Sequence, residues 1–176
     1  MTEMEKQKTQ KEENPVFVKL DVFLYGIAAE AARDHEFHAA LRHSFGKELT
    51  LGRMDAWAAF YRIADKAGIW PAVRDDAFFA AGLVCWYEGS ELGRAKSVSS
   101  ALKSLPQEAR VTAAHRIQQL LYIRDHRILY GKLIALIRFL KKYGISVSPK
   151  SLLHDLVYWN YPSHPVQKSW LRNLRY

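Results

Sequence analysis

The residues of this chain best suited to chemistry are cations at helical spacing in its second half, and the chemistry they suit is anion binding. Residues 116–144, RIQQLLYIRDHRILYGKLIALIRFLKKYG, read as two helical segments. At 100° per residue, Arg127, Arg138 and Lys142 fall within roughly 60° of one another on the second segment, with Lys141 flanking them. The wheel places no carboxylate on that side. Such a face predicts contact with a polyanion.

The opposite side of the same segment must be buried. Its leucines and isoleucine recur at helical spacing and fill an apolar stripe about 100° wide. The outer cations also have an ordinary explanation, because Lys and Arg near a helix C-terminus complement the helix dipole. Taken alone, the segment does not decide between the two explanations. The apolar stripe consists of Leu129, Leu133, Leu136, Ile137 and Leu140.

The distribution of charge over the whole chain favours the polyanion. Residues 1–90 hold 11 Lys and Arg against 14 Asp and Glu, a net charge of −3. Residues 91–176 hold 15 Lys and Arg against 4 Asp and Glu, a net charge of +11. A chain that uses charge only for solubility mixes the signs, whereas a one-sided cationic half indicates a polyanionic partner, most commonly nucleic acid.

Residues that would support catalysis are scattered. A metal-dependent nuclease needs clustered carboxylates, and the basic half has only four acids, far apart in sequence. His35 and His38 lack the spacing of a zinc protease motif and have no third ligand nearby. The single Cys85 has no recognisable base and most simply fills a buried apolar position, and no glycine-rich phosphate loop is present. We therefore expect no enzyme, no metal site and no cofactor.

Length and composition indicate a folded soluble protein. With 176 residues, 49% of them hydrophobic, the chain can bury a core as one domain or as two lobes. The charged N-terminus lacks the apolar segment of a signal peptide or membrane anchor, so we expect a cytoplasmic protein. The predicted organisation is a disordered tail at 1–14, an N-terminal helical lobe at 15–90, a basic connecting loop and short helix at 91–106, and a basic C-terminal helical lobe at 107–176.

Apolar periodicity and capping residues predict the fold class. Helical spacing runs through most of the chain, and no alternating period of strand length stands out. Asp34, Asp55 and Ser148 are placed to cap helices, and Pro71 and Pro149 to begin them. We expect an all-α, two-lobed bundle of about eight to nine helices.

From about Ser97 to the C-terminus, and more weakly from Asp55 to Gly89, the chain resembles a known family. It is similar to the small subunit of type I-E CRISPR surveillance complexes, the CasB family of Cascade. A glycine that the family often has in the first matching piece is replaced here by Ser99 or Ser100. The matching pieces are SVSSAL (97–102), HRIQQLLYIRD (115–125), LIALIRFLKKYGISVSPKSLLHDLVYW (133–159), VQKSWLRNLRY (166–176) and the short AAFYRI (58–63).

The resemblance implies an all-helical, two-lobed, non-enzymatic subunit that sits as a pair within the Cascade complex. It also implies contact with other Cascade subunits, with the guide RNA–DNA hybrid and with single-stranded DNA, without reading sequence. Base pairing with the guide supplies specificity in such complexes, and backbone contacts tip a nearly balanced strand exchange. The implied task is to stabilise this R-loop, the displaced strand included.

Twelve cations are our candidates for phosphate contact. Arg62 and Arg116, which fall in matching pieces, are equally well explained as braces between the lobes, because Arg buries its stem readily. Trp159, Tyr161 and Trp170 can stack on unpaired bases, although their spacing favours core packing. The candidates are Arg42, Lys47, Arg62, Arg94, Lys96, Arg116, Arg124, Arg127, Lys132, Arg138, Lys141 and Lys142.

Two other functions compete with nucleic-acid binding. The first is a helical protein–protein adaptor whose basic half docks an acidic partner. The second is a peripheral protein of anionic membranes, which is disfavoured because the cations lie opposite a stripe that the core requires.

Overall fold

The computed structural model describes residues 14–47 and 54–174, and within these ranges the fold is all-α. Nine α-helices, two short 3-10 helices and one isolated β-bridge make up its regular structure, which confirms the expected helical bundle. The α-helices are α2 (Pro15–Arg33), α3 (His35–Ser44), α4 (Met54–Ala67), α5 (Arg74–Trp86), α6 (Val98–Lys103), α7 (Gln107–Leu120), α8 (His126–Lys142), α9 (Pro149–Val157) and α10 (Pro165–Arg172), and the 3-10 helices are η2 (Pro71–Val73) and η3 (Leu92–Arg94).

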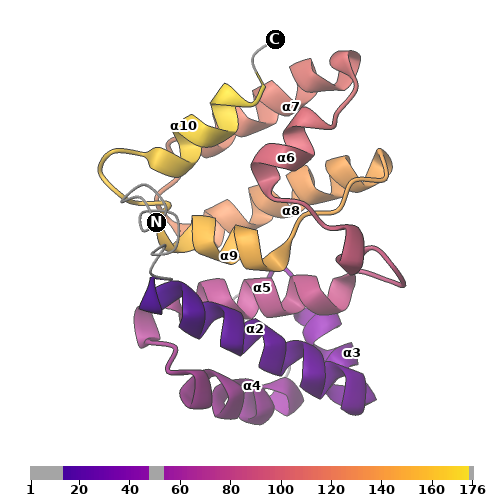
Figure 1. The fold of residues 1–176 in the computed structure, drawn as a ribbon, viewed down its shortest axis with the longest axis vertical. Helices are drawn as coiled ribbons and strands as arrows, with labels where there is room; N and C mark the ends of the chain where they lie inside the picture. The colour runs from indigo at the N-terminus through magenta and orange to yellow at the C-terminus, as the bar shows by residue number, and fades with distance from the viewer. Residues whose placement is uncertain (1–13, 48–53, 175–176) are drawn as a thin grey trace, which may run out of the picture.

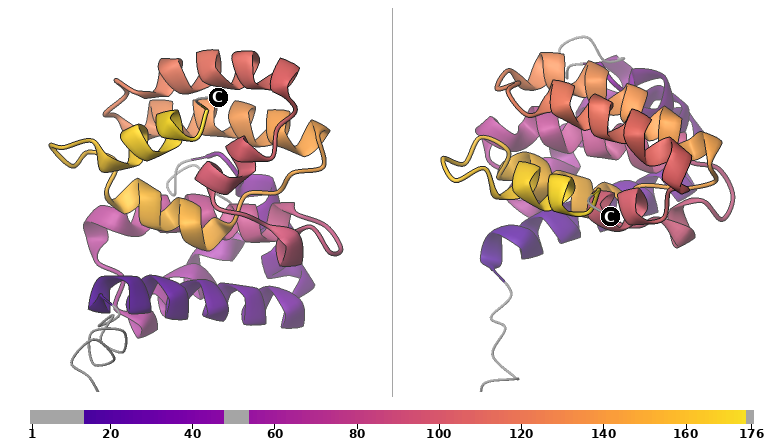
Figure 2. Two further views of the ribbon diagram at one scale, coloured as in Figure 1. Left: turned by 45° about the horizontal axis from the view of Figure 1, so that its top comes forward. Right: turned by 90° about the horizontal axis from the view of Figure 1, so that it is seen from above.

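The helices stack in layers, from α4 at the bottom of Figure 1 through α2, α5 and α9 to α7 and α10 at the top. Seen from above in Figure 2, α7 and α8 lie side by side, which agrees with the contacts between them. Two hydrophobic clusters fill the molecule. The first lies among α2 to α5, and the second lies among α5 to α10.

Capping residues explain where several helices begin. The Asp34 side chain accepts hydrogen bonds from the backbone N–H groups of Glu36 and Phe37, as its type predicts. Ser148 caps α9 in the same way, with Pro149 at the first helical position. The cap predicted at Asp55 is wrong, because α4 already begins at Met54.

The N-terminal end of the described chain is fixed to the second half. Residues 1–13 of the predicted tail lie outside the described residues. Asn14, the last residue of that prediction, is instead the N-cap of α2, and its side-chain amide donates to the hydroxyl of Tyr158 at 3.3 Å.

Helix α5 belongs to both clusters. Nine of its 13 residues are buried, including the small residues Ala77, Ala80, Ala81 and Gly82. Phe78 points into the first cluster, and Phe79 points into the second. A helix that is apolar on every side must be surrounded, so α5 is the layer that joins the two cores. The predicted division near residue 90 therefore falls just after an element that both cores share.

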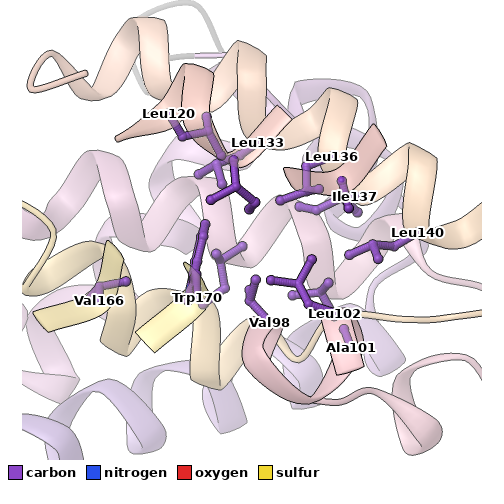
Figure 3. Close-up of a cluster of buried hydrophobic side chains, with 14 of the residues drawn as sticks. Val98, Ala101, Leu102, Leu120, Leu133, Leu136, Ile137, Leu140, Val166 and Trp170 are labelled. Atoms are coloured by element: carbon purple, nitrogen blue, oxygen red, sulfur yellow. The ribbon is translucent and has the colours of Figure 1, made fainter. Parts of the chain in front are cut away.

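The second cluster supports α8. All five residues of the predicted apolar stripe are at most 1% exposed, which confirms the stripe. Figure 3 shows Leu133, Leu136, Ile137 and Leu140 in one cluster with Trp170 of α10, Leu102 of α6 and Leu120 of α7. One side of α8 is thus fixed in the core, and the other faces outward.

The segment predicted as a basic connecting loop and short helix, residues 91–106, lies against the second cluster. It forms η3 and α6, and Val98 of α6 is buried in the second cluster. The backbone of Lys96 donates to Ser146 O at 2.8 Å and accepts from Ser148 N at 2.7 Å. This segment is therefore held against the start of α9.

Candidate nucleic-acid interface

The outward side of α8 carries a basic strip, which we call the α8 face and define as Arg127, Gly131, Ala135, Arg138 and Lys142. These residues follow one another at helical spacing on the side opposite the buried stripe. All but the half-buried Ala135 are exposed, and a Cβ added at Gly131 would meet nothing within 4 Å. Small residues between cations leave room for a phosphodiester backbone to approach the helix.

Two cations of the α8 face are left for an external anion. Arg138 and Lys142 have no carboxylate partner within the described part of the chain. Lys142 also lies in the last turn, where it complements the helix dipole. That local effect leaves its ammonium group in solvent.

The prediction that no carboxylate lies beside these cations is wrong at the start of α8. Asp125 accepts from the backbone N–H of Arg127 at 2.9 Å, and its second oxygen lies 3.0 Å from the guanidinium of the same residue. The hydrogen bonds from Arg127 lower the pKa of the Asp125 carboxyl below its ordinary value, so it stays ionised. Asp125 thus serves as the N-cap of α8 and offsets the first cation of the face.

Lys141, which the helical wheel placed beside the α8 face, has partners within the fold. Its ammonium group lies 4.3 Å from the ring centre of Trp86 and 3.2 Å from the carboxylate of Glu91. The hydrogen bond from the backbone of Glu88 and the contact with Lys141 lower the pKa of Glu91. Lys141 therefore fastens the end of α8 to the segment after α5.

Arg116 lies between α7 and α8. Its guanidinium carbon is 5.2 Å from the ring centre of Phe139, and its Nε is buried without a hydrogen-bond partner. The stem is thus packed between two helices of the second cluster, so the contacts of Arg116 are within one cluster and do not join the lobes.

Two of the three candidates in the first half are engaged with acids. Arg42 pairs with Glu88, and Arg62 pairs with Glu30 at 3.2 Å. The Arg62 pair joins α4 to α2 within one cluster, so it is not a brace between lobes. Lys47 is exposed at the end of α3.

The remaining candidates surround the second cluster. Arg124, Lys132 and Arg94 are exposed and have no carboxylate partner within the described residues. Lys96 is exposed as well, and its ammonium group donates to the hydroxyl of Ser104 at 2.9 Å. Arg124, Lys132, Arg138 and Lys142 therefore form the group that the α7–α8 turn and α8 bring to the surface without a neutralising acid.

Sequence reasoning left the exposed cations of α6 and α10 out of the candidate set. Lys103 lies on α6, and Lys168 and Arg172 lie on α10. The two helices are in contact through a hydrogen bond between Ser99 and Ser169 at 3.1 Å. In the sequence, Val166, Trp170 and Leu174 recur at helical spacing, and this spacing could have placed Lys168 and Arg172 on the outer side of the last helix.

Two of the three aromatic residues considered for base stacking belong to the core. Trp159 and Trp170 are each 1% exposed, and their ring centres lie 5.1 Å apart. Their indole N–H groups donate to Ile123 O at 2.8 Å and to the carboxylate of Asp155 at 2.9 Å. Tyr161 is exposed but contacts the ring of Tyr158.

A buried polar cluster at the junction of the two cores was not predicted. The carboxylate of Asp76 on α5 accepts from the hydroxyl of Tyr130 and from Nδ1 of His126, both at 2.6 Å. Burial alone would lower the pKa of His126, but the bond and charge of Asp76 outweigh burial and raise it. The periodicity of α8 cannot identify this contact, because the partner lies 50 residues away in sequence.

The described residues offer no arrangement typical of a metal site or a reactive thiol. No three His, Cys, Asp or Glu residues gather closely enough there to hold a metal ion. Cys85 is buried, and burial raises the pKa of its thiol to about 12, which disfavours the reactive thiolate. Within the same residues, no helix combines the length and apolar character needed to cross a bilayer.

Comparison with known proteins identifies the family. The family profile described as CRISPR-associated protein Cse2 matches residues 37–173, which include most of α3, all of α4 to α10 and both unpaired cations of the α8 face, Arg138 and Lys142. Neither the curated proteins nor the solved structures compared with the chain gave a match. Because the matched range covers most of the chain, the protein belongs to the Cse2 family, the small subunit of type I-E CRISPR Cascade complexes.

Proposed function

We propose that this Cascade subunit is a non-catalytic protein that binds nucleic-acid backbone and stabilises the R-loop between guide RNA and target DNA, including the displaced strand. The observation that carries the proposal is the α8 face, where Arg138 and Lys142 are exposed without carboxylate partners opposite a fully buried stripe. Family membership supplies the assembly in which a nucleic acid would meet that face.

The mechanism requires cations rather than groups that read bases. Lys and Arg side chains neutralise phosphates and release counterions, which favours binding without regard to sequence. Exchange of a DNA duplex for an RNA–DNA hybrid is nearly balanced in free energy, so a few backbone contacts can tip it. Arg124, Lys132, Arg138 and Lys142 are the residues we assign to these contacts.

A salt series with a matched control tests the proposal. The affinity of the full chain for single-stranded and duplex DNA is measured between low and physiological salt. One variant, called the α8 variant, combines Lys132→Gln, Arg138→Gln and Lys142→Gln. The control combines Lys19→Gln, Arg33→Gln and Lys66→Gln, which removes the same charge from exposed positions on α2 and α4.

Phosphate contact predicts a steep salt dependence for the wild type. The slope of log affinity against log salt should flatten by about three units in the α8 variant, about one unit for each lost contact. The control variant should keep the wild-type slope. Equal slopes in all three proteins would reject Lys132, Arg138 and Lys142 as phosphate contacts.

A protein–protein adaptor is the second candidate function. The adaptor considered from the sequence docks an acidic partner through the basic half, whereas the structure offers a different surface for a protein partner, on helix α2. Val18, Val22 and Tyr25 on the outer side of α2 are 39%, 53% and 79% exposed, although the inner side of the same helix is already apolar and buried. A groove of about 480 Å³ lies between α2 and α4. A helix that is apolar on both sides is expected to have protein on both sides.

We also propose that two copies associate within the complex and contact other subunits.

Co-purification of Val22→Asp and of the α8 variant with the other Cascade subunits separates the nucleic-acid-binding function from the adaptor function. Nucleic-acid binding predicts that the α8 variant assembles but binds DNA weakly. Failure of the α8 variant to assemble, with its DNA affinity unchanged, would support the adaptor function over nucleic-acid binding.

A further inference from the structure

The turn between α7 and α8 accepts hydrogen bonds from two side chains that follow α9. The indole N–H of Trp159 donates to Ile123 O at 2.8 Å, and the side-chain amide of Asn160 donates to Arg124 O at 3.0 Å. Within the turn, Ile123 N donates to Leu120 O at 3.0 Å. The backbone of this turn is therefore held in one conformation although it lies at the surface.

This fixed turn presents an uncovered aromatic ring. Tyr122 is 89% exposed, the largest exposed fraction of any large apolar side chain in the described residues, while its neighbours Leu121 and Ile123 pack against the core. Ile128, on the first turn of α8, is 58% exposed. A rigid turn that leaves apolar surface uncovered in this way marks a contact site.

Other exposed tyrosines lack this combination of a free ring and nearby unpaired cations. Tyr161 and Tyr143 contact the rings of Tyr158 and Phe139. Tyr25 is exposed on α2, in the acidic half of the chain. Tyr122 has no ring contact among the described residues.

The charges around Tyr122 indicate the occupant. Arg124, two residues further along the same turn, is exposed without a carboxylate partner among the described residues. The nearest acid in sequence, Asp125, is bound to Arg127 and to the start of α8. An uncovered aromatic ring close in sequence to an unneutralised cation matches an unpaired nucleotide, whose base presents a flat face and whose phosphate is anionic.

We propose that Tyr122 is a base-stacking site for single-stranded nucleic acid, with Arg124 holding an adjacent phosphate. Stacking on a tyrosine ring tolerates any base, so the site adds affinity for an unpaired strand without reading its sequence. Bases inside a duplex are already stacked and do not reach the ring. The site therefore favours unpaired strands over duplex. This inference rests on the proposed nucleic-acid function.

The test removes the bases and the ring separately. The probes are an oligothymidine strand and a strand of equal length in which every residue is an abasic tetrahydrofuran, so the phosphates are the same. Both are titrated into the wild-type chain, Tyr122→Ala, Tyr122→Phe and the control Tyr25→Ala. Circular dichroism verifies that each variant is folded.

We expect the wild type to prefer oligothymidine over the abasic strand by about 10-fold, since a stacked base contributes one to a few kcal/mol. Tyr122→Ala should lose this preference and keep the wild-type salt slope, because no phosphate contact is lost. Tyr122→Phe and Tyr25→Ala should retain the preference. If Tyr122→Ala keeps it too, the stacking site is rejected and backbone binding stands. If the wild type binds neither strand at low salt, both proposals fail.

Discussion

The cations on α2 to α5, which surround the first hydrophobic cluster and are called here the first region, have acidic neighbours, whereas most cations of the α8 face do not. Around the first cluster, Arg33 and Arg62 share Glu30, and Arg74 pairs with Asp65 at 2.6 Å. On the α8 face, Arg138 and Lys142 have no such partner within the described residues. Most cations of the first region are therefore engaged within the fold, whereas those of the second remain available to an external anion.

Asp76→Ala should have the largest effect on stability and none on anion binding. The change leaves Tyr130 and His126 without their acceptor at a site where Asp76 is 4% exposed. We expect the free energy of unfolding to fall by about 3 kcal/mol. Urea denaturation measures it, and the salt slope of DNA binding provides the control. A loss below about 1 kcal/mol would show that the buried cluster contributes little.

Lys141 and Lys142 offer the sharpest comparison, because they are neighbours with different surroundings. Lys141→Gln removes a contact with Trp86 and the ion pair with Glu91, so we expect a loss of about 1 kcal/mol in stability and an unchanged salt slope. Lys142→Gln should leave stability within about 0.5 kcal/mol and flatten the slope by about one unit. If Lys141→Gln flattens the slope and Lys142→Gln does not, the anion site includes Lys141 in place of Lys142.

A smaller effect concerns pH. Because the pKa of His126 is raised in the folded chain, its contribution to stability is complete below the unfolded pKa of 6.5 and is lost as pH rises through the folded value. The charged groups around it are Asp76, Asp125 and Asp75. Unfolding free energies of the wild type and His126→Gln are measured from pH 5 to pH 9. We expect their difference to shrink as pH rises, and a constant difference would contradict the raised pKa.

The other buried titratable groups make this difference measurement necessary. Burial raises the pKa of Asp155 to about 6. Its contribution to the free energy of unfolding therefore also falls as pH rises from the unfolded pKa of 3.8 to the folded value. Burial lowers the pKa of His154, which acts in the opposite direction. Both groups are present in the wild type and in the variant and therefore cancel in the difference.

Arg62→Gln should have the smallest effect. The side chain is 65% exposed, and its pair with Glu30 crosses only from α4 to α2. Exposed pairs contribute a few tenths of a kcal/mol because solvent screens them. Thermal unfolding should be almost unchanged, and so should the affinity for DNA. A clear loss of affinity would move part of the interface into the first region.

The fold could be predicted where a single helix contains the information. The stripe from Leu129 to Leu140 and the caps at Asp34 and Ser148 depend on neighbours within one turn, and all of them are confirmed. The spacing also placed Arg138 and Lys142 on the outer side of α8, where they lie exposed.

The surroundings of individual charges could not be predicted in this way. Glu91 meets Lys141 across 50 residues, and Asp76 meets His126 across the same separation. Such partners depend on how α5 and the segment after it lie against α8, which no periodicity reports. For the same reason the sequence did not identify Tyr122, since Trp159 and Asn160, which bond to its turn, lie 36 residues from their acceptors.

The burial of α5 between two cores has a consequence for how the chain unfolds. Phe78 and Phe79 are adjacent, yet they fill different clusters, and Leu153 of α9 completes the first cluster from the second half. Opening either cluster exposes an element that the other needs, so the two halves should melt together in one cooperative transition. Native-state hydrogen exchange is then expected to show the amides of α5 and α9 exchanging only through global unfolding.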